Sequence, residues 1–356
     1  MASSEVSQRP RRLMLVSVPR TASNLLAKIL NIAQQPDVLS NEAAGYFFHP
    51  AFSATALGGY LSTPSTEWTD EQKQTLRSIF QGCVNTIEEH AERAEKANKI
   101  LFAKEHAGSL FSPAAFEKWQ TGDSKANDEL FDALRLEFPE KFGPHTFSPS
   151  SQSMLSDEYL RLWQYVFIIR HPALAWPSLR RCQRKIVEAE ITKGLDQTDE
   201  QKRDVSLSNM TMRWTRLLFD WFCDQGFKPT PLIVDANDLI NHPEIAARLC
   251  EQTGMDANAV QYEWDNMEKR SEDWKTGNNV DDATHDRNIA LAKIMLGTLE
   301  NSTGVIKQKV SSDIDISKEA EQWRVEFGEE DAKFIEKAVR DSMPDYEYLM
   351  AHRITV

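Results

Sequence analysis

Four short apolar runs, each followed by polar residues and then by apolar side chains at helical spacing, constrain the fold of this chain more than any other feature. The runs cover residues 13–18, 100–103, 165–169 and 231–234. Apolar runs of this length, without polar alternation, are typical of strands buried on both faces of a parallel sheet. Parallel neighbours need a crossover connection, which the helical segments supply. The sequence therefore predicts an α/β fold with a mostly parallel central sheet and helices on both faces.

The segments between and after these runs have the spacing of helices. We expect long helices over 70–98, 172–193 and 199–225, shorter ones over 128–138 and 243–254, and a last helix over 328–343. Thr69 and Asp70 are suited to cap the first of these helices. Polar residues at 118–127 and the Pro-, Gly- and Ser-rich stretch 139–153 predict connections without regular structure.

The length and composition fit one large domain. The chain has 356 residues, of which 41% are hydrophobic. We expect a disordered arm over 1–11 and a single domain over 12–356, in which the polar stretch 268–320 is a candidate mobile flap.

The cysteines at 83, 182, 223 and 250 have neither metal-ligand nor disulfide spacing, so reduced, mostly buried thiols and no metal are expected.

The charge balance bears on the partners of the protein. The formal net charge is −13, which argues against broad binding to nucleic acid or to anionic membranes. The sequence has no long uncharged apolar stretch and its first residues do not resemble a secretory signal, so we expect a cytoplasmic protein. Any anionic ligand must be held by a local pocket. The sequence does not indicate an oligomeric state.

The turn after the first apolar run is a candidate phosphate site. It reads Pro19, Arg20, Thr21, Ala22, Ser23 and Asn24 between a strand and a helix. Free N–H groups at a helix N-terminus, together with the Arg20 cation, favour an anion, and the Thr21 and Ser23 hydroxyls add donors. The pattern GxxxxGK[ST] is absent, which argues against nucleoside triphosphate hydrolysis. On its own, this turn is also compatible with an ordinary capped helix.

A second candidate anion site follows the third apolar run. Arg170 comes directly after the strand, and Ser178 lies eight residues further along, in the expected helix. The arginine can make a charge-assisted, bidentate contact with a phosphate. The carboxyl ends of parallel strands meet at one edge of a sheet, where open α/β folds bind nucleotides. The two sites together therefore predict a ligand with two separated phosphate groups.

With these two motifs the chain resembles the sulfotransferases that use 3′-phosphoadenosine 5′-phosphosulfate (PAPS). Residues 17–25 match all but one position of the family's loop, [ST]-x-P-[KR]-[ST]-G-[ST]-[TN] and a hydrophobic residue, and Arg170 and Ser178 match its 3′-phosphate motif. Weaker similarity extends over residues 12–350. The resemblance implies a three-layer P-loop-like fold with helical insertions and, as function, transfer of a sulfuryl group from PAPS to a hydroxyl or amine of a small apolar molecule. PAPS would be held by Pro19, Arg20, Thr21, Ala22, Ser23, Asn24, Arg170 and Ser178, without a metal.

The chain departs from the family pattern at points that leave two alternatives open. Ala22 replaces the loop glycine, and the RKGxxG element is absent, with Lys318 and Arg324 as the nearby cations. One alternative is an enzyme of the same fold that has lost PAPS and catalyses a cyclisation or elimination in secondary metabolism. The other is a non-catalytic nucleotide-binding protein.

Sulfuryl transfer needs charge stabilisation and a base. Arg20 is assigned electrostatic support of the leaving phosphate, because an arginine does not readily release a proton. His106 resembles the histidine of the family's Lys-x-His element, with Lys104 as a contact to the sulfuryl oxygens. Glu42 is the alternative base, if it is buried beside an apolar acceptor pocket that raises its pKa. The aromatic residues from 46 to 52 are candidates for the wall of that pocket or for the core.

Overall fold

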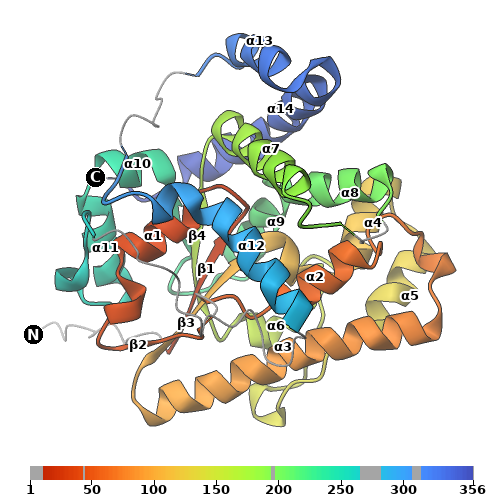
Figure 1. Ribbon diagram of the computed structural model, residues 1–356. Helices are drawn as coiled ribbons and strands as arrows, with labels where there is room; N and C mark the ends of the chain where they lie inside the picture. The colour runs from red at the N-terminus through yellow and green to blue at the C-terminus, as the bar shows by residue number, and fades with distance from the viewer. Residues whose placement is uncertain (1–10, 43–44, 194–196, 265–281, 307–313, 356) are drawn as a thin grey trace, which may run out of the picture.

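A parallel sheet with the strand order β2-β3-β1-β4-β5 lies at the centre of the computed structural model, which describes residues 11–42, 45–193, 197–264, 282–306 and 314–355 (Figure 1). The strands are β1 (Arg12–Ser17), β2 (Val38–Leu39), β3 (Ile100–His106), β4 (Gln164–Ile169) and β5 (Leu232–Asp235). Every pairing in this sheet is parallel. The predicted α/β class and sheet type are confirmed, and the short edge strand β2 is added to the four strands predicted.

The strand register brings polar residues together at the carboxyl edge of the sheet. Ser17 at the end of β1 is paired with His106 at the end of β3. On the other side of β1, Val16 is paired with Phe167 of β4, so Arg170 follows β4 at the same edge. Asp235 ends β5 beside Ile169. The edge thus collects the groups that the sequence places far apart.

Helices cover both faces of the sheet and extend beyond it. The helices are α1 (Ser23–Ile29), α2 (His49–Leu57), α3 (Asp70–Lys96), α4 (Pro113–Thr121), α5 (Lys125–Ala133), α6 (Asp157–Leu160), α7 (Pro172–Glu188), α8 (Asp199–Asn209), α9 (Arg213–Asp224), α10 (Ala236–Asn241), α11 (Glu244–Thr253), α12 (Asp282–Glu300), α13 (Ile316–Phe327) and α14 (Glu329–Ala351). Among these, α1, α10 and α11 bury apolar residues against one face, and α3, α9 and α14 against the other. The sheet is therefore the middle of three layers.

The long helix α3 shows why these residues form this element. Its apolar side chains recur on one stripe, where Leu76, Phe80 and Ile87 are fully buried. Thr69 accepts a hydrogen bond from the N–H of Gln72, whose side chain accepts one from the N–H of Thr69. This reciprocal cap satisfies two donors that the first turn leaves unpaired, and it confirms Thr69 as the capping residue.

The segment expected as one helix over 199–225 is two helices, α8 and α9. The chain leaves helical geometry at Met210, and the Thr211 hydroxyl accepts the N–H of Arg213 at the start of α9. The side chains of Met210 and Met212 are both buried at this break. The apolar spacing continues across the break, so the pattern did not reveal it.

Other helix boundaries also differ from those predicted: α7 ends at Glu188 instead of 193, and α5 covers Lys125–Ala133 instead of 128–138. The supposed polar connection 118–127 contains the end of α4 and the start of α5, where Ser124 caps the helix through the N–H of Asn127. The helix expected to end at 343 is α14, which continues past Pro344 to Ala351. Proline removes one backbone donor, and the burial of Tyr346 and Leu349 beyond it favours continuation.

The remaining expectations concern the ends, the flap and the cysteines. Residues 1–10 of the expected arm, and 268–281 and 307–313 of the expected flap, lie outside the described residues. The described part of that stretch contains α12 and the start of α13. All four cysteines are free, and only that at 223 is exposed. No helix among the described residues has both the length and the apolar character to cross a bilayer.

Gly45 should tolerate no side chain. Its φ is +94°, and a Cβ there would lie 2.9 Å from the backbone nitrogen of Lys104. We expect Gly45→Ala to lower the free energy of unfolding by about 2 kcal/mol or more, through strain and steric conflict. Gly82→Ala, in helix α3 with open space around it, is the control and should raise it by roughly 0.5–1 kcal/mol. Urea unfolding measures both; equal effects of the two variants would contradict the prediction.

Candidate active site

A cavity of about 690 Å³ opens at the carboxyl edge of the sheet, between α1, α7 and α12. Small-molecule sites have volumes of roughly 300–1,000 Å³. The predicted site residues that line the cavity are Pro19, Arg20, Ala22, Ser23, Asn24, His106, Arg170 and Ser178. Segments that are more than 150 residues apart in the sequence thus meet around one space.

The turn between β1 and α1 has an unusual backbone. Arg20 and Ala22 both have φ of 70°, the left-handed conformation that side chains disfavour. Ala22 is the N-cap position of α1 and makes no side-chain cap. The alanine therefore adopts a conformation that a glycine would adopt without strain.

Thr21 holds this turn instead of facing the cavity. Its side chain is fully buried, and its hydroxyl donates to the carbonyl oxygen of Val18 at 2.8 Å. The expectation that this hydroxyl adds a phosphate donor is therefore wrong in this structure. Ser23, the other hydroxyl of the turn, does line the cavity.

The two predicted anion sites are in direct contact. Arg20 donates through Nε to the Ser178 hydroxyl at 3.0 Å, and Arg170 donates through Nη1 to the carbonyl oxygen of Arg20 at 3.1 Å. Arg20 also donates to the carbonyl oxygen of Met295 on α12. The first crossover and the helix after β4 thus form one continuous cationic surface.

The positive charges of Arg20 and Arg170 are not neutralised by ion pairs among the described residues. Burial, and then the charge of Arg20, lower the pKa of Arg170 to about 10, against the opposing effect of Asp235. Two like charges held close in a partly enclosed space favour a bound anion.

Lys104 adds a third cation beside the turn. It is fully buried on β3, and its ammonium group donates to the side-chain oxygen of Asn24 at the start of α1. The same nitrogen lies 4.3 Å from the ring centre of Tyr46, a cation–π contact. The lysine therefore lies directly behind the cavity wall that Asn24 and Tyr46 form.

His106, the last residue of β3, has both ring nitrogens engaged. Nδ1 lies 3.0 Å from the Ser17 hydroxyl, which itself donates to the Glu105 carbonyl oxygen at 3.3 Å, so Nδ1 is the donor. Nε2 then accepts from the Tyr46 hydroxyl, at 3.3 Å. Burial, followed by the charge of Lys104, lowers the pKa of His106 to about 3, which keeps the ring neutral.

Glu42, the alternative base, is exposed and does not line the cavity. The expectation that it is buried beside an apolar pocket is therefore wrong. Neighbouring Asn41 organises the loop instead, because its side chain bonds the backbone of both Gly45 and Tyr46. Of the two candidate bases, the structure brings only His106 to the cavity.

Glu105, which we did not predict, is a buried carboxyl group at the cavity. It accepts hydrogen bonds from the N–H groups of Phe47 and Phe48 at 2.5 and 2.9 Å. Burial raises its pKa to about 8, although these bonds and Lys104 oppose the shift. A signal was present in the sequence, because an acidic residue inside a buried strand is rare unless it is paired or functional.

Some of the aromatic residues from 46 to 52 line the cavity, and others belong to the core. Tyr46, His49 and Phe52 line the cavity, whereas Phe47 and Phe48 are buried in the core. A smaller cavity of about 40 Å³ adjoins the main one, with four residues lining both: Phe52, His106, Ser109 and Asn209. Its other walls are mostly apolar and aromatic, and they include Phe80, Phe111, Phe116 and Trp214.

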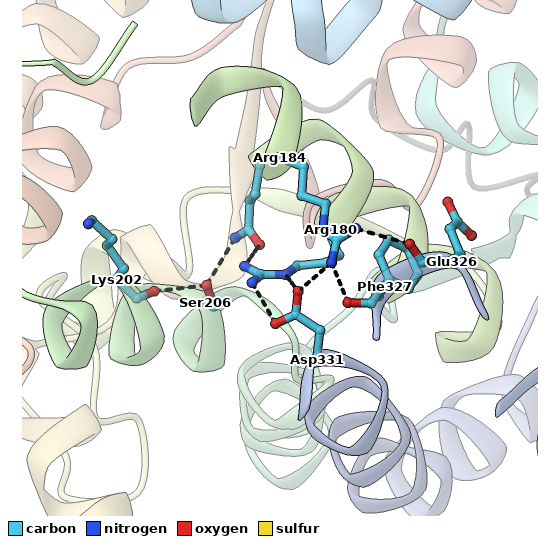
Figure 2. Close-up of polar contacts among 8 residues, drawn as sticks. Arg180, Arg184, Lys202, Ser206, Glu326, Phe327 and Asp331 are labelled. Atoms are coloured by element: carbon cyan, nitrogen blue, oxygen red, sulfur yellow. Dashed lines mark hydrogen bonds and ion pairs between the residues drawn. The ribbon is translucent and has the colours of Figure 1, made fainter. Parts of the chain in front are cut away.

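Helix α7, which carries Ser178, is held in place by its arginines (Figure 2). Arg180 makes two hydrogen bonds to the carboxylate of Asp331 on α14, at 2.6 and 3.0 Å, and Arg184 bonds the same carboxylate at 3.0 Å. Arg181 pairs with Glu326 of α13 and also lines the cavity. These contacts fix the α13–α14 hairpin against the helix.

Lys318 and Arg324, the cations nearest in the sequence to the position of the absent RKGxxG element, lie away from the cavity. Lys318 is exposed and pairs with Asp315, and Arg324 pairs with Glu336. Neither lines the cavity.

The fold and the site define an α/β protein with a cavity lined by two arginines at the carboxyl edge of a parallel sheet, and comparison with known proteins gives its family. The chain is 32% identical over 362 residues to the sulfotransferase ppzF of Metarhizium rileyi, with 97% of each chain covered. It is also 32% identical over 370 residues to the sulfotransferase ppzF of Metarhizium majus, again with 97% of each covered. The protein therefore belongs to the sulfotransferase family.

Two solved structures are more distant. They are the sulfotransferase domains from the Synechococcus PCC 7002 olefin synthase and from the curacin biosynthetic pathway, each 12% identical, with TM-scores of 0.34 and 0.35. They cover 90% and 88% of this chain, and the chain covers 96% and 97% of theirs. No protein-family model matches the sequence.

The strained alanine of the turn predicts a stabilising substitution. Ala22→Gly should raise the free energy of unfolding by about 1 kcal/mol, because glycine adopts φ of 70° without the left-handed penalty. Ala27→Gly, inside the same helix α1, is the control and should lower it by roughly 1 kcal/mol. A loss of stability in both variants, measured by urea unfolding, would show that the turn is not strained at Ala22.

Glu105 predicts a pH dependence of stability. Its pKa is about 8 in the folded protein, above the ordinary 4.5, so the folded state holds a proton that the unfolded state releases between these values. The stabilisation of the folded state by this proton is fully present below about pH 4.5 and is lost as the pH rises to about 8. The free energy of unfolding of Glu105→Gln, taken relative to that of wild type, should therefore rise by on the order of 2–4 kcal/mol from pH 5 to pH 9. Urea unfolding at both pH values tests this, and a pH-independent difference between the variants would refute it.

Proposed function

We propose that this sulfotransferase transfers the sulfuryl group of PAPS to a hydroxyl or amine of a small, largely apolar molecule. The observation that carries the proposal is the contact of Arg20 with Ser178 and of Arg170 with Arg20, in a cavity that His106 also lines. A ligand with phosphate groups at two positions suits this surface better than a single small anion, because it satisfies both cationic ends.

The residues of the cavity fit such a donor. The N–H groups at the start of α1, with Arg20, would hold the 5′-phosphosulfate, and Arg170 with Ser178 would hold the 3′-phosphate. The absence of a carboxylate partner for either arginine within the described residues supports this assignment. The donor supplies an activated sulfuryl group, whose transfer needs an oxygen or nitrogen nucleophile.

His106 is assigned the role of general base. Its neutral ring can accept a proton at Nε2, the nitrogen not used by the Ser17 contact. The charge of Lys104 disfavours an imidazolium ion, and an anion bound beside that lysine would offset this effect. Lys104 and Arg20 would also stabilise negative charge on the transferred group and on the leaving phosphate.

The apolar walls around His106 support an apolar acceptor. Phe52 lines both the main cavity and the smaller one, and Ser109 and Asn209 provide polar groups that also line both. Ser109 is 6% exposed and lines both cavities. An acceptor with an apolar body and a second polar group suits this junction.

Two measurements test the proposed function. Calorimetry with adenosine 3′,5′-bisphosphate should show binding of one nucleotide per chain, and protein with labelled PAPS and a panel of alcohols, phenols and amines should yield labelled product. Absence of binding at millimolar bisphosphate would favour an enzyme that has lost PAPS. Binding without transfer across the panel, and unaltered by His106→Ala, would favour a nucleotide-binding protein.

Arg170 should matter more for nucleotide affinity than Ser178. A buried charge-assisted contact is worth about 1.5–3 kcal/mol and a neutral one about 1 kcal/mol. Arg170→Ala should thus raise the Kd for adenosine 3′,5′-bisphosphate roughly 10- to 150-fold, and Ser178→Ala about fivefold. Arg77→Ala, which removes a surface ion pair with Glu137, should leave the Kd unchanged. Equal losses of affinity in Arg170→Ala and Ser178→Ala, measured by calorimetry, would contradict the assignment.

A further inference from the structure

Tyr46 lies where the acceptor would have to meet His106. Its hydroxyl is 3.3 Å from Nε2 of His106, and its side chain lines the main cavity. The other ring nitrogen faces the Ser17 hydroxyl. An acceptor therefore reaches Nε2 only by displacing the tyrosine hydroxyl or by transferring its proton through it.

Displacement is disfavoured because the tyrosine is anchored on several sides. Asn41 donates to the carbonyl oxygen of Tyr46 at 2.7 Å and accepts the N–H of Gly45 at 2.8 Å. The N–H of Lys104 donates to the carbonyl oxygen of Gly45 at 2.9 Å. The Lys104 ammonium nitrogen also lies 4.3 Å from the centre of the Tyr46 ring. Movement of the ring would remove one of the contacts of a buried cation.

We propose that the hydroxyl of Tyr46 relays the proton of the acceptor to Nε2 of His106. The inference rests on the proposed function, because it needs His106 to be the base. In this step the acceptor O–H bond breaks and a new O–H bond forms on Tyr46. The original hydroxyl proton of Tyr46 moves to Nε2. The acceptor oxygen keeps the electron pair with which it bonds to sulfur, and the tyrosine is neutral before and after.

In this relay Tyr46 is a catalytic residue in its own right, because its hydroxyl would contact the acceptor. Burial raises the pKa of its hydroxyl above the ordinary value, with a further contribution from the charge of Glu105, so the group remains protonated and able to donate. Concerted transfer through a neutral hydroxyl avoids a tyrosinate in a site of this kind.

The matched variants are Tyr46→Phe, which keeps the ring beneath Lys104 and removes only the hydroxyl, and Tyr60→Phe. Tyr60 lies outside the cavity, with its ring against Trp68, so its variant reports the effect of losing a tyrosine hydroxyl elsewhere. Both variants should bind adenosine 3′,5′-bisphosphate as wild type does. The acceptors used are benzyl alcohol, which must lose a proton, and 4-nitrophenol, which is largely ionised in mildly alkaline solution.

With PAPS as donor, Tyr46→Phe should lower kcat for benzyl alcohol about tenfold or more and change kcat for ionised 4-nitrophenol less than twofold. Tyr60→Phe should change neither. Equal slowing with both acceptors would show a structural role, and an unchanged or faster reaction with benzyl alcohol would show that the acceptor displaces the tyrosine. Either result would overturn the relay.

Nitrogen-15 NMR of the histidine side chains provides a readout that needs no acceptor. In the ligand-free protein, the resonance missing from His106→Asn identifies His106. Tyr46→Phe should move its Nε2 signal toward that of a nitrogen without a hydrogen bond and leave Nδ1 protonated. An unmoved Nε2 signal would refute the contact on which the relay depends. If wild type binds no bisphosphate, the proposed function fails; if wild type transfers sulfuryl groups and Tyr46→Phe equals it with benzyl alcohol, only the relay fails.

Discussion

The site depends on two guanidinium groups that lie together at one cavity and form no ion pair with a carboxylate in the part of the chain that the structure describes. Arg20 and Arg170 repel each other, and their contact through a backbone carbonyl relieves only part of that repulsion. The chain as a whole carries a formal net charge of the opposite sign, −13. The concentration of positive charge here is therefore a local property of the fold, created where two strand ends meet.

The sheet makes this concentration of charge possible because it supplies a rigid edge. β1 is central and is paired on both sides, so the turn after it is fixed with respect to β3 and β4. The core on the two faces supports a turn with two left-handed residues and a strand that ends in Lys104, Glu105 and His106. Because side chains alternate along a strand, the lysine and histidine face one way and the glutamate the other. Glu105 can then anchor the chain before α2 while its neighbours face the turn.

Features that depend on residue type and spacing at short range could be predicted from the sequence, whereas features set by packing could not. The sequence predicts the unit of strand, turn and helix around Arg20 because a buried run, a polar turn and apolar helical spacing occur within about twenty residues. The break at Met210 escaped prediction because the apolar spacing is the same on both sides of it, and only packing decides that both methionines are buried there. The burial expected for Glu42 failed for the same reason, since a loop residue's exposure is set by the elements around it.

The sequence by itself determined the alternation of strands and helices, the parallel sheet and the two cationic motifs, because residue type and spacing at short range specify these features. Only the tertiary structure decided that Arg20 reaches Ser178, that Thr21 turns inward, and that Tyr46 and Ser17 occupy the two nitrogens of His106. These contacts join segments up to 158 residues apart. Their geometry follows from strand register and side-chain packing, which a linear pattern does not encode.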